Sequence, residues 1–434
     1  MFPRLAVLLL LTLSGLVGSL CTAAPSAAPD LAAGFTTTDG RVLPLSLLRP
    51  ADLPAEGPLP TIFYLRNLAS PRAGREPDAP ILRSFLEAGC QVFTIDFGSH
   101  ASARVPALNR ELGRLRDEVH AGRLLKDARI DPARLYLVPA GCRLLRDVVY
   151  YRDSAQDRVL ALDLIYPSQA AVPFGAVLEF SCDNKDRMGN YSLSVCSDTL
   201  LEGFATEGFA VAMADHPVKA PYKGFDPLPE CTWKVRAALR MLRATAAPLG
   251  HNGAVVPLGF SRGSGMALLL ATTAGQPEHD GHGELGTGRD DVQGAIVMSG
   301  RFSYLDLLPS DRMIPRYEKA WGPRAENLDT WRSQGALDQH RGGELPPLFL
   351  TINCTEGAEA LHQMKVLRCR LAGLGADAQF MMDRQPRGHK VTLVPAIISA
   401  MNRYLHERLD GPAVVIATAP APLGAVPPAR ASEP

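Results

Sequence analysis

Short apolar runs alternate with amphipathic segments along most of this chain of 434 residues. Runs such as "GAVLEF" and "AVVPLGF" are almost wholly apolar, which is typical of parallel strands buried on both faces. Between them lie longer segments such as "VRAALRMLRATAA", whose apolar residues recur at helical spacing. This alternation predicts a doubly wound α/β fold with a mostly parallel sheet.

From residue 147 onward the pattern predicts two strands followed by repeated strand–helix units. The predicted strands are residues 147–153, 160–167, 175–180, 209–215, 254–260, 292–300, 347–352 and 378–382. The predicted helices are residues 197–208, 231–247, 360–375 and 394–409, with one more that begins at Gly263.

The segment before this body, residues 24–145, is predicted to be a separate α/β region. Its strand–helix order is the same as that of residues 175–262, and its "VPAGCR" parallels the later "VPLGFSR". This internal similarity indicates a degenerate half-repeat, with a simple accessory domain as the alternative. The region lacks the serine of the later motif, so no catalytic role is expected for it.

The two ends of the chain differ from the body. Residues 1–23 contain one cation, Arg4, then an apolar run too short for a membrane span, then small residues. This order predicts a cleaved signal peptide and a secreted or periplasmic protein, with an uncleaved anchor as the alternative. Residues 412–434 are rich in Pro and Ala and are predicted to be a tail, which leaves residues 146–411 as the main domain.

Charge and metal-binding residue types narrow the choice of partners. The chain has 45 Lys+Arg and 45 Asp+Glu, so its formal net charge is zero. This charge balance gives no electrostatic reason to expect nucleic acid or an anionic membrane as a partner. The segment "EHDGHGE", residues 278–284, contains metal-ligating residue types, but it lies in a glycine-rich stretch without helical spacing. No metal or other cofactor is expected.

The segment "GFSRG" lies between a predicted buried strand and a predicted helix. Gly259, Ser261 and Gly263 form the pattern G-x-S-x-G, in which a tight turn raises a serine hydroxyl above the sheet and small residues keep strand and helix apart. A purely structural turn is the alternative. Pro257 argues against a central strand here, because proline cannot donate a hydrogen bond to a neighbouring strand.

A serine needs a base to take its proton and a third group to orient that base. His389 follows the last predicted strand, where the base is expected when the chain order is Ser, acid, His. The acid should then follow the strand at residues 347–352, which makes Glu356 the first candidate and Glu359 the second. Asp306, after the preceding strand, is a third candidate.

On these motifs, residues 147–409 resemble the α/β-hydrolase family of serine esterases, and most of all secreted carboxylic-ester hydrolases of the acetyl xylan, feruloyl and small-acyl type. The resemblance implies that Ser261, His389 and Glu356 form a triad and that the reaction passes through an acyl-enzyme. The sequence departs from the family in having Glu as the acid. It also has residues 181–190 in place of an HGGG-type loop.

An oxyanion hole is expected beside the serine. Its first donor would be the backbone N–H of Arg262, and its second would come from Ser181 or Cys182. An arginine directly after the serine also occurs in glucuronoyl esterases, which this turn partly resembles. A surface salt bridge is the alternative role for the Arg262 side chain.

Residues 301–344 form a long insertion between two predicted strands. It contains Tyr304, Tyr317, Trp321 and Trp331, and of these Tyr304, Trp321 and Trp331 are predicted to line a substrate pocket for an apolar or sugar group. The alternative is that these rings fix the insertion to the body.

The sequence therefore predicts a secreted serine esterase that acts on a small-molecule or polysaccharide-linked ester. A serine peptidase on the same fold is the second hypothesis, because a triad alone does not separate esters from amides. A catalytically inactive hydrolase fold used for binding is the third.

Overall fold

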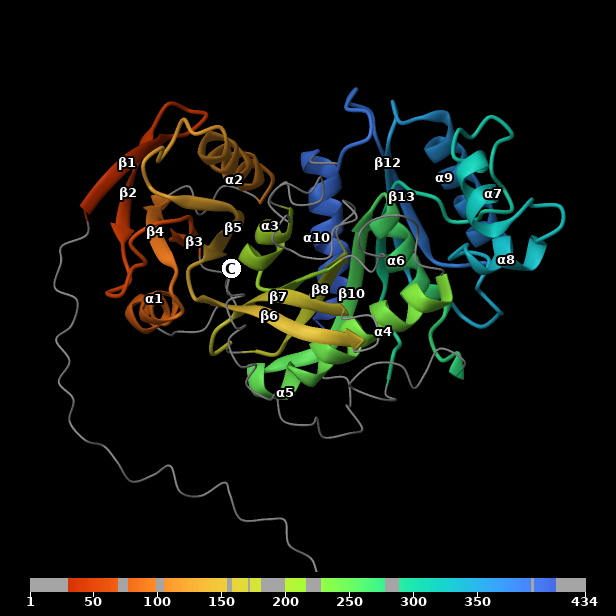
Figure 1. Cartoon of the computed structure of the whole chain (residues 1–434), viewed down its shortest axis with the longest axis horizontal. Helices are drawn as coiled ribbons and strands as arrows, with labels where there is room; N and C mark the ends of the chain where they lie inside the picture. The colour runs from red at the N-terminus through yellow and green to blue at the C-terminus, as the bar shows by residue number, and fades with distance from the viewer. Residues whose placement is uncertain are drawn as a thin grey trace, which may run out of the picture.

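The computed structural model describes residues 30–68, 77–98, 105–153, 158–170, 172–180, 200–215, 228–277, 289–391 and 394–410. Within these residues the chain forms a mixed α/β structure with two sheets, of five and eight strands (Figure 1). The predicted signal peptide, the predicted tail and the segment "EHDGHGE" lie outside the described residues. Across the described ranges, no helix combines the length and the apolar character that a membrane span requires.

The five-stranded sheet is built from the N-terminal part of the chain. Strand β3 runs parallel to its neighbours β4 and β5, whereas β2 is antiparallel to both of its neighbours, β1 and β4. In spatial order the strands are β1 (Asp30–Thr36), β2 (Val42–Leu48), β4 (Gln91–Asp96), β3 (Leu59–Arg66) and β5 (Ile130–Pro139). The helices of this part are α1 (Asp78–Glu87) and α2 (Val105–His120).

The eight-stranded sheet contains every strand from residue 142 onward that the structure describes. It is parallel from β13 to β9, and β7 and β6 are antiparallel at its other edge, so the predicted mostly parallel α/β sheet is confirmed. In spatial order the strands are β13 (Ala378–Asp383), β12 (Leu348–Asn353), β11 (Ala295–Met298), β10 (His251–Phe260), β8 (Phe174–Phe180), β9 (Ala210–Ala214), β7 (Arg158–Pro167) and β6 (Cys142–Asp153). The helices are α3 (Leu200–Thr206), α4 (Leu228–Ala244), α5 (Ala246–Leu249), α6 (Arg262–Thr272), α7 (Ile314–Trp321), α8 (Leu328–Ser333), α9 (Ala358–Gly373) and α10 (Pro395–Leu409).

The two sheets share a strand order. The sequence β1-β2-β4-β3-β5 in the first sheet corresponds to β6-β7-β9-β8-β10 in the second, with the same parallel and antiparallel neighbours. The sheets are joined by a tight turn between β5 and β6, at Ala140 and Gly141. The change of sheet therefore lies a few residues before the predicted boundary at 145/146.

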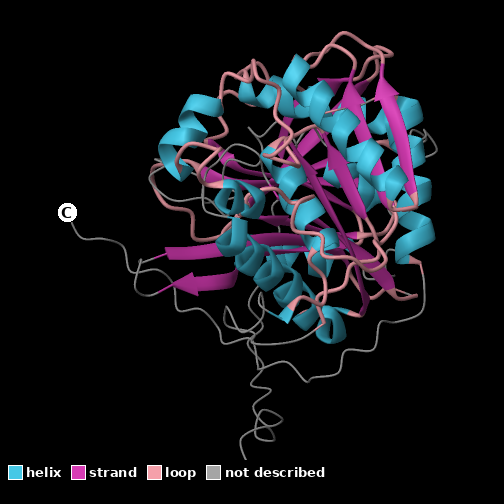
Figure 2. Ribbon diagram, turned by 90° about the vertical axis from the view of Figure 1, so that its right-hand side faces the viewer, coloured by secondary structure: helices cyan, strands magenta, loops and turns pink. Residues whose placement is uncertain are grey.

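Helices cover both faces of the eight-stranded sheet (Figure 2). On one face α4, α6 and α9 bury apolar residues against the strands. On the other face α3 and α10 share a single hydrophobic cluster with α1 and with residues of β3, β4 and β5. The two sheets thus share one hydrophobic core. Burial of apolar surface is the main favourable term in folding, so this shared core stabilises the two sheets against each other.

Pro257 is accommodated inside β10. Both backbone polar groups of Val255 bond to Gln293 on the β11 side, and alternate residues of a strand point their N–H groups to the same neighbour. The missing N–H of Pro257 therefore faces β11, whose pairing with β10 begins one residue later, at Leu258. The proline interrupts no bond between these two strands.

A buried carboxylate lies where the two sheets meet. Asp163 on β7 is 4% exposed, and it accepts hydrogen bonds from the Tyr136 hydroxyl on β5 and from the Asp147 N–H on β6, each at 2.8 Å. Burial raises the pKa of Asp163 to about 6, although the Tyr136 hydrogen bond opposes this. The charged form of Asp163 is thus disfavoured in the folded protein.

Asp163→Asn is expected to stabilise the protein at neutral pH. The pKa of Asp163 in the folded protein is about 6, above the value of about 3.9 for an unfolded chain, so the folded state binds more protons and stability falls as pH rises between these values. An asparagine carries no proton to lose, so the variant should gain up to about 3 kcal/mol over the wild type at pH 7 and nothing at pH 4. Urea unfolding between pH 4 and pH 8 measures this gain, and a constant difference across that range would contradict it.

Candidate active site

Ser261 sits at the turn between the end of β10 and the start of α6. Its backbone has φ 55° and ψ −122°, a conformation that a residue with a Cβ rarely adopts. Its N–H donates to the Met298 carbonyl of the neighbouring strand at 3.0 Å. Such strain persists only where the surrounding structure enforces it, and it is common at active sites.

Close packing around the turn requires glycine at two positions, Gly259 of the motif and Gly300 of the neighbouring strand end. A Cβ atom at Gly259 would lie 2.1 Å from the Gly263 carbonyl oxygen, so strand and helix could not approach this closely with any larger residue. A Cβ atom at Gly300 would lie 2.6 Å from the Ser261 carbonyl oxygen. The turn is therefore enclosed from two sides, which fixes the position of the serine.

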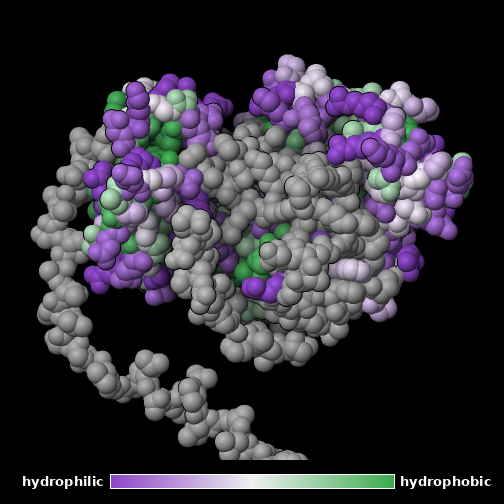
Figure 3. Space-filling model, viewed as in Figure 1, coloured by the Kyte–Doolittle hydropathy of each residue, from purple (hydrophilic) through white to green (hydrophobic). Residues whose placement is uncertain are grey.

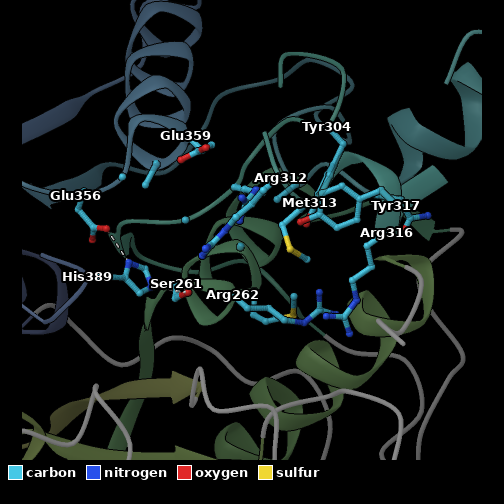
Figure 4. A pocket seen from close by; sticks show the side chains of 18 residues that line it. Ser261, Arg262, Tyr304, Arg312, Met313, Arg316, Tyr317, Glu356, Glu359 and His389 are labelled. Carbon is cyan, nitrogen blue, oxygen red and sulfur yellow. Dashed lines mark hydrogen bonds and ion pairs between the residues drawn. The ribbon is translucent and has the colours of Figure 1, made fainter. Parts of the chain in front are cut away.

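The structure brings Ser261, His389 and Glu356 together (Figure 4). His389 Nε2 is 3.0 Å from Ser261 Oγ, and His389 Nδ1 is 2.7 Å from Glu356 Oε2. Because the ionised carboxylate can only accept, Nδ1 carries the proton and Nε2 accepts from the serine hydroxyl. The side chain of His389 is 51% exposed whereas that of Glu356 is 1% exposed, so the imidazole is accessible and the carboxylate is shielded from solvent.

The loops that carry His389 and Glu356 are linked to each other by hydrogen bonds. Glu356 follows β12 and His389 follows β13, and the two strands are parallel neighbours, so both loops leave the same edge of the sheet. The Gly388 N–H donates to Thr355 Oγ1 at 2.9 Å, and Asn353 Nδ2 donates to the Gln385 carbonyl at 2.6 Å. These two hydrogen bonds fix the loop of His389 relative to the loop of Glu356.

The other two acid candidates are not bonded to His389 in the structure. Asp306 accepts from Ser303 Oγ at 2.9 Å and pairs with Arg370, and its carbonyl oxygen faces His362 Nε2 at 2.8 Å. Glu359 lies on the pocket wall in the first turn of α9. Of the three candidates, Glu356 is the one that the structure places against the histidine.

The predicted oxyanion donors are only partly described. Arg262 begins α6 directly after the serine and lines the pocket. Ser181 and Cys182 lie outside the described residues, so the second donor stays a prediction.

A cavity of about 510 Å³ opens on the serine and the histidine. Its walls come from the start of α6, the insertion at residues 301–344 and the start of α9 (Figure 4). The lining residues are Ser261, Arg262, Gly265, Met266, Gly300, Arg301, Tyr304, Arg312, Met313, Arg316, Tyr317, Gln334, Ala336, Glu356, Gly357, Glu359, Ala360 and His389. A cavity of this size accommodates a small organic ligand.

The aromatic residues of the insertion divide between the cavity and a core of their own. Tyr304 and Tyr317 line the cavity. Trp331 is fully buried and donates from Nε1 to the Gly322 carbonyl at 3.0 Å, and Trp321 stacks on Tyr317 with ring centroids 4.8 Å apart. The structure thus places both tryptophans behind the wall, in a cluster that holds α7 and α8 together.

Sequence reasoning missed three charged residues of the wall, Arg301, Arg312 and Arg316. Arginines spaced along an insertion give no periodic signal, and the predicted pocket residues of the insertion are all aromatic. The signal that could have found them is the presence of three arginines within residues 301–316, next to two aspartates.

Comparisons with known proteins gave matches among solved structures alone. No family model matches the chain, and neither does any curated protein. A truncated carbohydrate esterase from gut microbiota matches 61% of this chain and 95% of its own, at 18% identity and a TM-score of 0.49. A butyrate-bound esterase from the planctomycete Thermogutta terrifontis matches 61% and 93%, at 16% identity and 0.47. A bifunctional GH43-CE protein from Bacteroides eggerthii matches 61% of this chain and 35% of its own, at 18% identity and 0.49.

Proposed function

We propose that this protein is a serine esterase of the α/β-hydrolase type, with Ser261 as nucleophile, His389 as base and Glu356 as the orienting acid. One observation carries the proposal. The hydrogen-bonded series from Ser261 Oγ to His389 and on to Glu356 lies at the mouth of a cavity, on a strained turn between a strand and a helix.

The geometry supports a two-step reaction. Ser261 Oγ attacks the ester carbonyl carbon while His389 Nε2 takes its proton, and the resulting oxyanion accepts from the Arg262 N–H. The protonated histidine then gives its proton to the leaving alkoxide as the carbon–oxygen bond breaks, which leaves an acyl-enzyme. Water then attacks the acyl carbon with His389 again as base. The proton returns from His389 to Ser261 Oγ, the carboxylic acid product leaves, and the serine is regenerated. Glu356 keeps the proton of His389 on Nδ1 throughout.

Covalent labelling tests this function. A fluorophosphonate probe should label the wild type at Ser261 and fail to label Ser261→Ala, because the probe reacts with an activated serine. A protein that is folded and not labelled would be the inactive binding fold. Parallel assays with ester and peptide substrates separate an esterase from a peptidase, and turnover of peptides alone would overturn the proposal.

We also propose that the esterase is exported. The support is the order of a cation, a short apolar run and small residues in the first 23 positions. The mature protein isolated from the culture fluid or periplasm should begin near Ala24 by N-terminal sequencing. A chain that retains Met1 and sediments with membranes would contradict export.

We further infer that the N-terminal region is a degenerate half-repeat of the catalytic domain. The support is the shared strand order of the two sheets, added to the similarity of "VPAGCR" and "VPLGFSR". After β5 the chain passes into strand β6 rather than a helix, so this copy has no turn of the kind that carries Ser261. Superposition of the two sets of five strands tests the inference, and a fit no better than that of unrelated sheets would contradict it.

A further inference from the structure

Charge is distributed unequally around the cavity that opens on Ser261. Figure 4 shows Glu356 and Glu359 on one side and Arg316 on the other, with Arg312 between them. The charged wall residues, apart from the catalytic histidine, are Arg262, Arg301, Arg312, Arg316, Glu356 and Glu359. Four of these six residues are arginines, and the charge of Arg301 is matched by Asp311 behind the wall.

Arg301 and Glu356 each hold a neighbouring residue of the site in place. Arg301 donates from Nε and Nη2 to the two oxygens of Asp311, each at 3.0 Å, and Glu356 holds the catalytic histidine. Asp311 is buried and also accepts from the Met313 N–H at 2.9 Å. The backbone next to Arg312 is therefore anchored through Asp311 before any ligand binds.

Arg312 and Arg316 both line the cavity from the segment around the start of α7. Arg312 lies two residues before α7, and Arg316 lies in the first turn of that helix. Both side chains are exposed. The described surface at this end of the molecule, over α7, α8 and α9, is mostly hydrophilic (Figure 3).

Arg262 extends toward the same end of the cavity. Burial raises the pKa of Tyr317, whereas the nearby guanidinium groups of Arg301 and Arg262 act to lower it. The charge of Arg262 is thus felt on the insertion side of the cavity, where Tyr317 lies. In Figure 4 the side chain runs from beside Ser261 toward Arg316, away from His389.

We propose that Arg262, Arg312 and Arg316 form a subsite for a carboxylate of the substrate. The enzyme would then prefer esters that carry one anionic group away from the scissile carbonyl. The planar guanidinium matches a carboxylate with two parallel hydrogen bonds. Glu359 on the opposite wall repels the same group, so the charge pattern orients the substrate with its carboxylate toward the insertion. This inference rests on the proposed ester hydrolysis at Ser261.

Matched pairs of esters test the subsite on the two sides of the scissile bond. For the acyl side the pair is 4-nitrophenyl hydrogen adipate and the neutral 4-nitrophenyl hexanoate. For the alcohol side the pair is 4-acetoxybenzoate and phenyl acetate. Charge-assisted hydrogen bonds to a carboxylate are expected to raise kcat/KM for the anionic member of at least one pair by about 10- to 100-fold. The responsive pair shows which side of the ester carries the charge.

Variants of the exposed arginines test the assignment. In Arg312→Gln and Arg316→Gln the ratio of kcat/KM for the anionic ester to that for the neutral ester should fall about 10-fold or more. The matched control is Arg332→Gln, which removes an exposed arginine of α8 that pairs with Asp329 and does not line the cavity. It should leave the ratio unchanged.

The possible outcomes distinguish a failure of the carboxylate subsite from a failure of the proposed esterase function. Rapid hydrolysis of the neutral esters with no anionic preference, or a preference that survives both arginine variants, would overturn the subsite and leave the esterase standing. No hydrolysis of any of the four esters by folded wild-type protein would overturn the proposed function as well.

Discussion

Replacing Ser261 with alanine is expected to lower kcat for ester hydrolysis about 10⁶-fold, and His389→Ala should cost about as much. The reason is that nucleophile and base act as one unit across the 3.0 Å contact between Oγ and Nε2. Once either is lost, the other has no function in the attack, so the double variant should be hardly slower than either single one. Steady-state assays with one chromogenic ester measure kcat for the two single variants and the double variant.

The matched control is Ser84→Ala. Ser84 is a helical serine of α1 whose hydroxyl donates to the Ile81 carbonyl, far from the cavity in sequence and outside its lining. It should retain wild-type kcat. If Ser261→Ala hydrolysed the ester at a rate near that of Ser84→Ala, the assignment of the nucleophile would be wrong.

Glu356→Gln is expected to lower kcat about 10⁴-fold, less than loss of the base, because the histidine remains able to act from a poorer tautomer. A glutamine can turn its NH₂ group toward Nδ1, which favours the proton on Nε2, where it blocks acceptance from the serine. The kcat values of Glu356→Gln, Glu359→Gln and Asp306→Asn, measured side by side, check the order of effects. Only Glu356→Gln should approach the loss of about 10⁴-fold in kcat.

Asp306→Asn serves as the sharpest contrast, because it removes the pairing of Asp306 with Arg370 without touching His389. It should affect stability more than kcat. Near-normal activity of Glu356→Gln together with a large loss in Asp306→Asn would move the acid to the loop after β11.

The sequence allowed the strand–helix order and the three residues at the site to be predicted, because each is a local signal. "GFSRG" joins an apolar run to a helical pattern, and Glu356 and His389 each follow an apolar run that became a parallel strand. The carboxyl ends of parallel strands meet at one edge of a sheet, so chain order alone brings such loops together.

The walls of the cavity could not be predicted in the same way, because they depend on how the insertion packs. Trp331 and Arg312 lie within one insertion, yet the former is fully buried and the latter is exposed on the cavity wall. Which side chains turn inward is decided by the stacking of Tyr317 and Trp321 and by the pairing of Arg301 with Asp311. Such contacts between side chains leave no periodic pattern in the sequence.

The common core of the two sheets has a consequence for how the chain reaches its folded state. Helix α10, the last described element, packs against α2 from the first sheet and shares its cluster with β3 and β4. Contacts between segments so far apart in sequence form late, after a large loss of chain entropy. The face of the N-terminal sheet that belongs to this common core is therefore completed only after α10 has been synthesised, and removal of α10 should leave that face exposed and prone to aggregation.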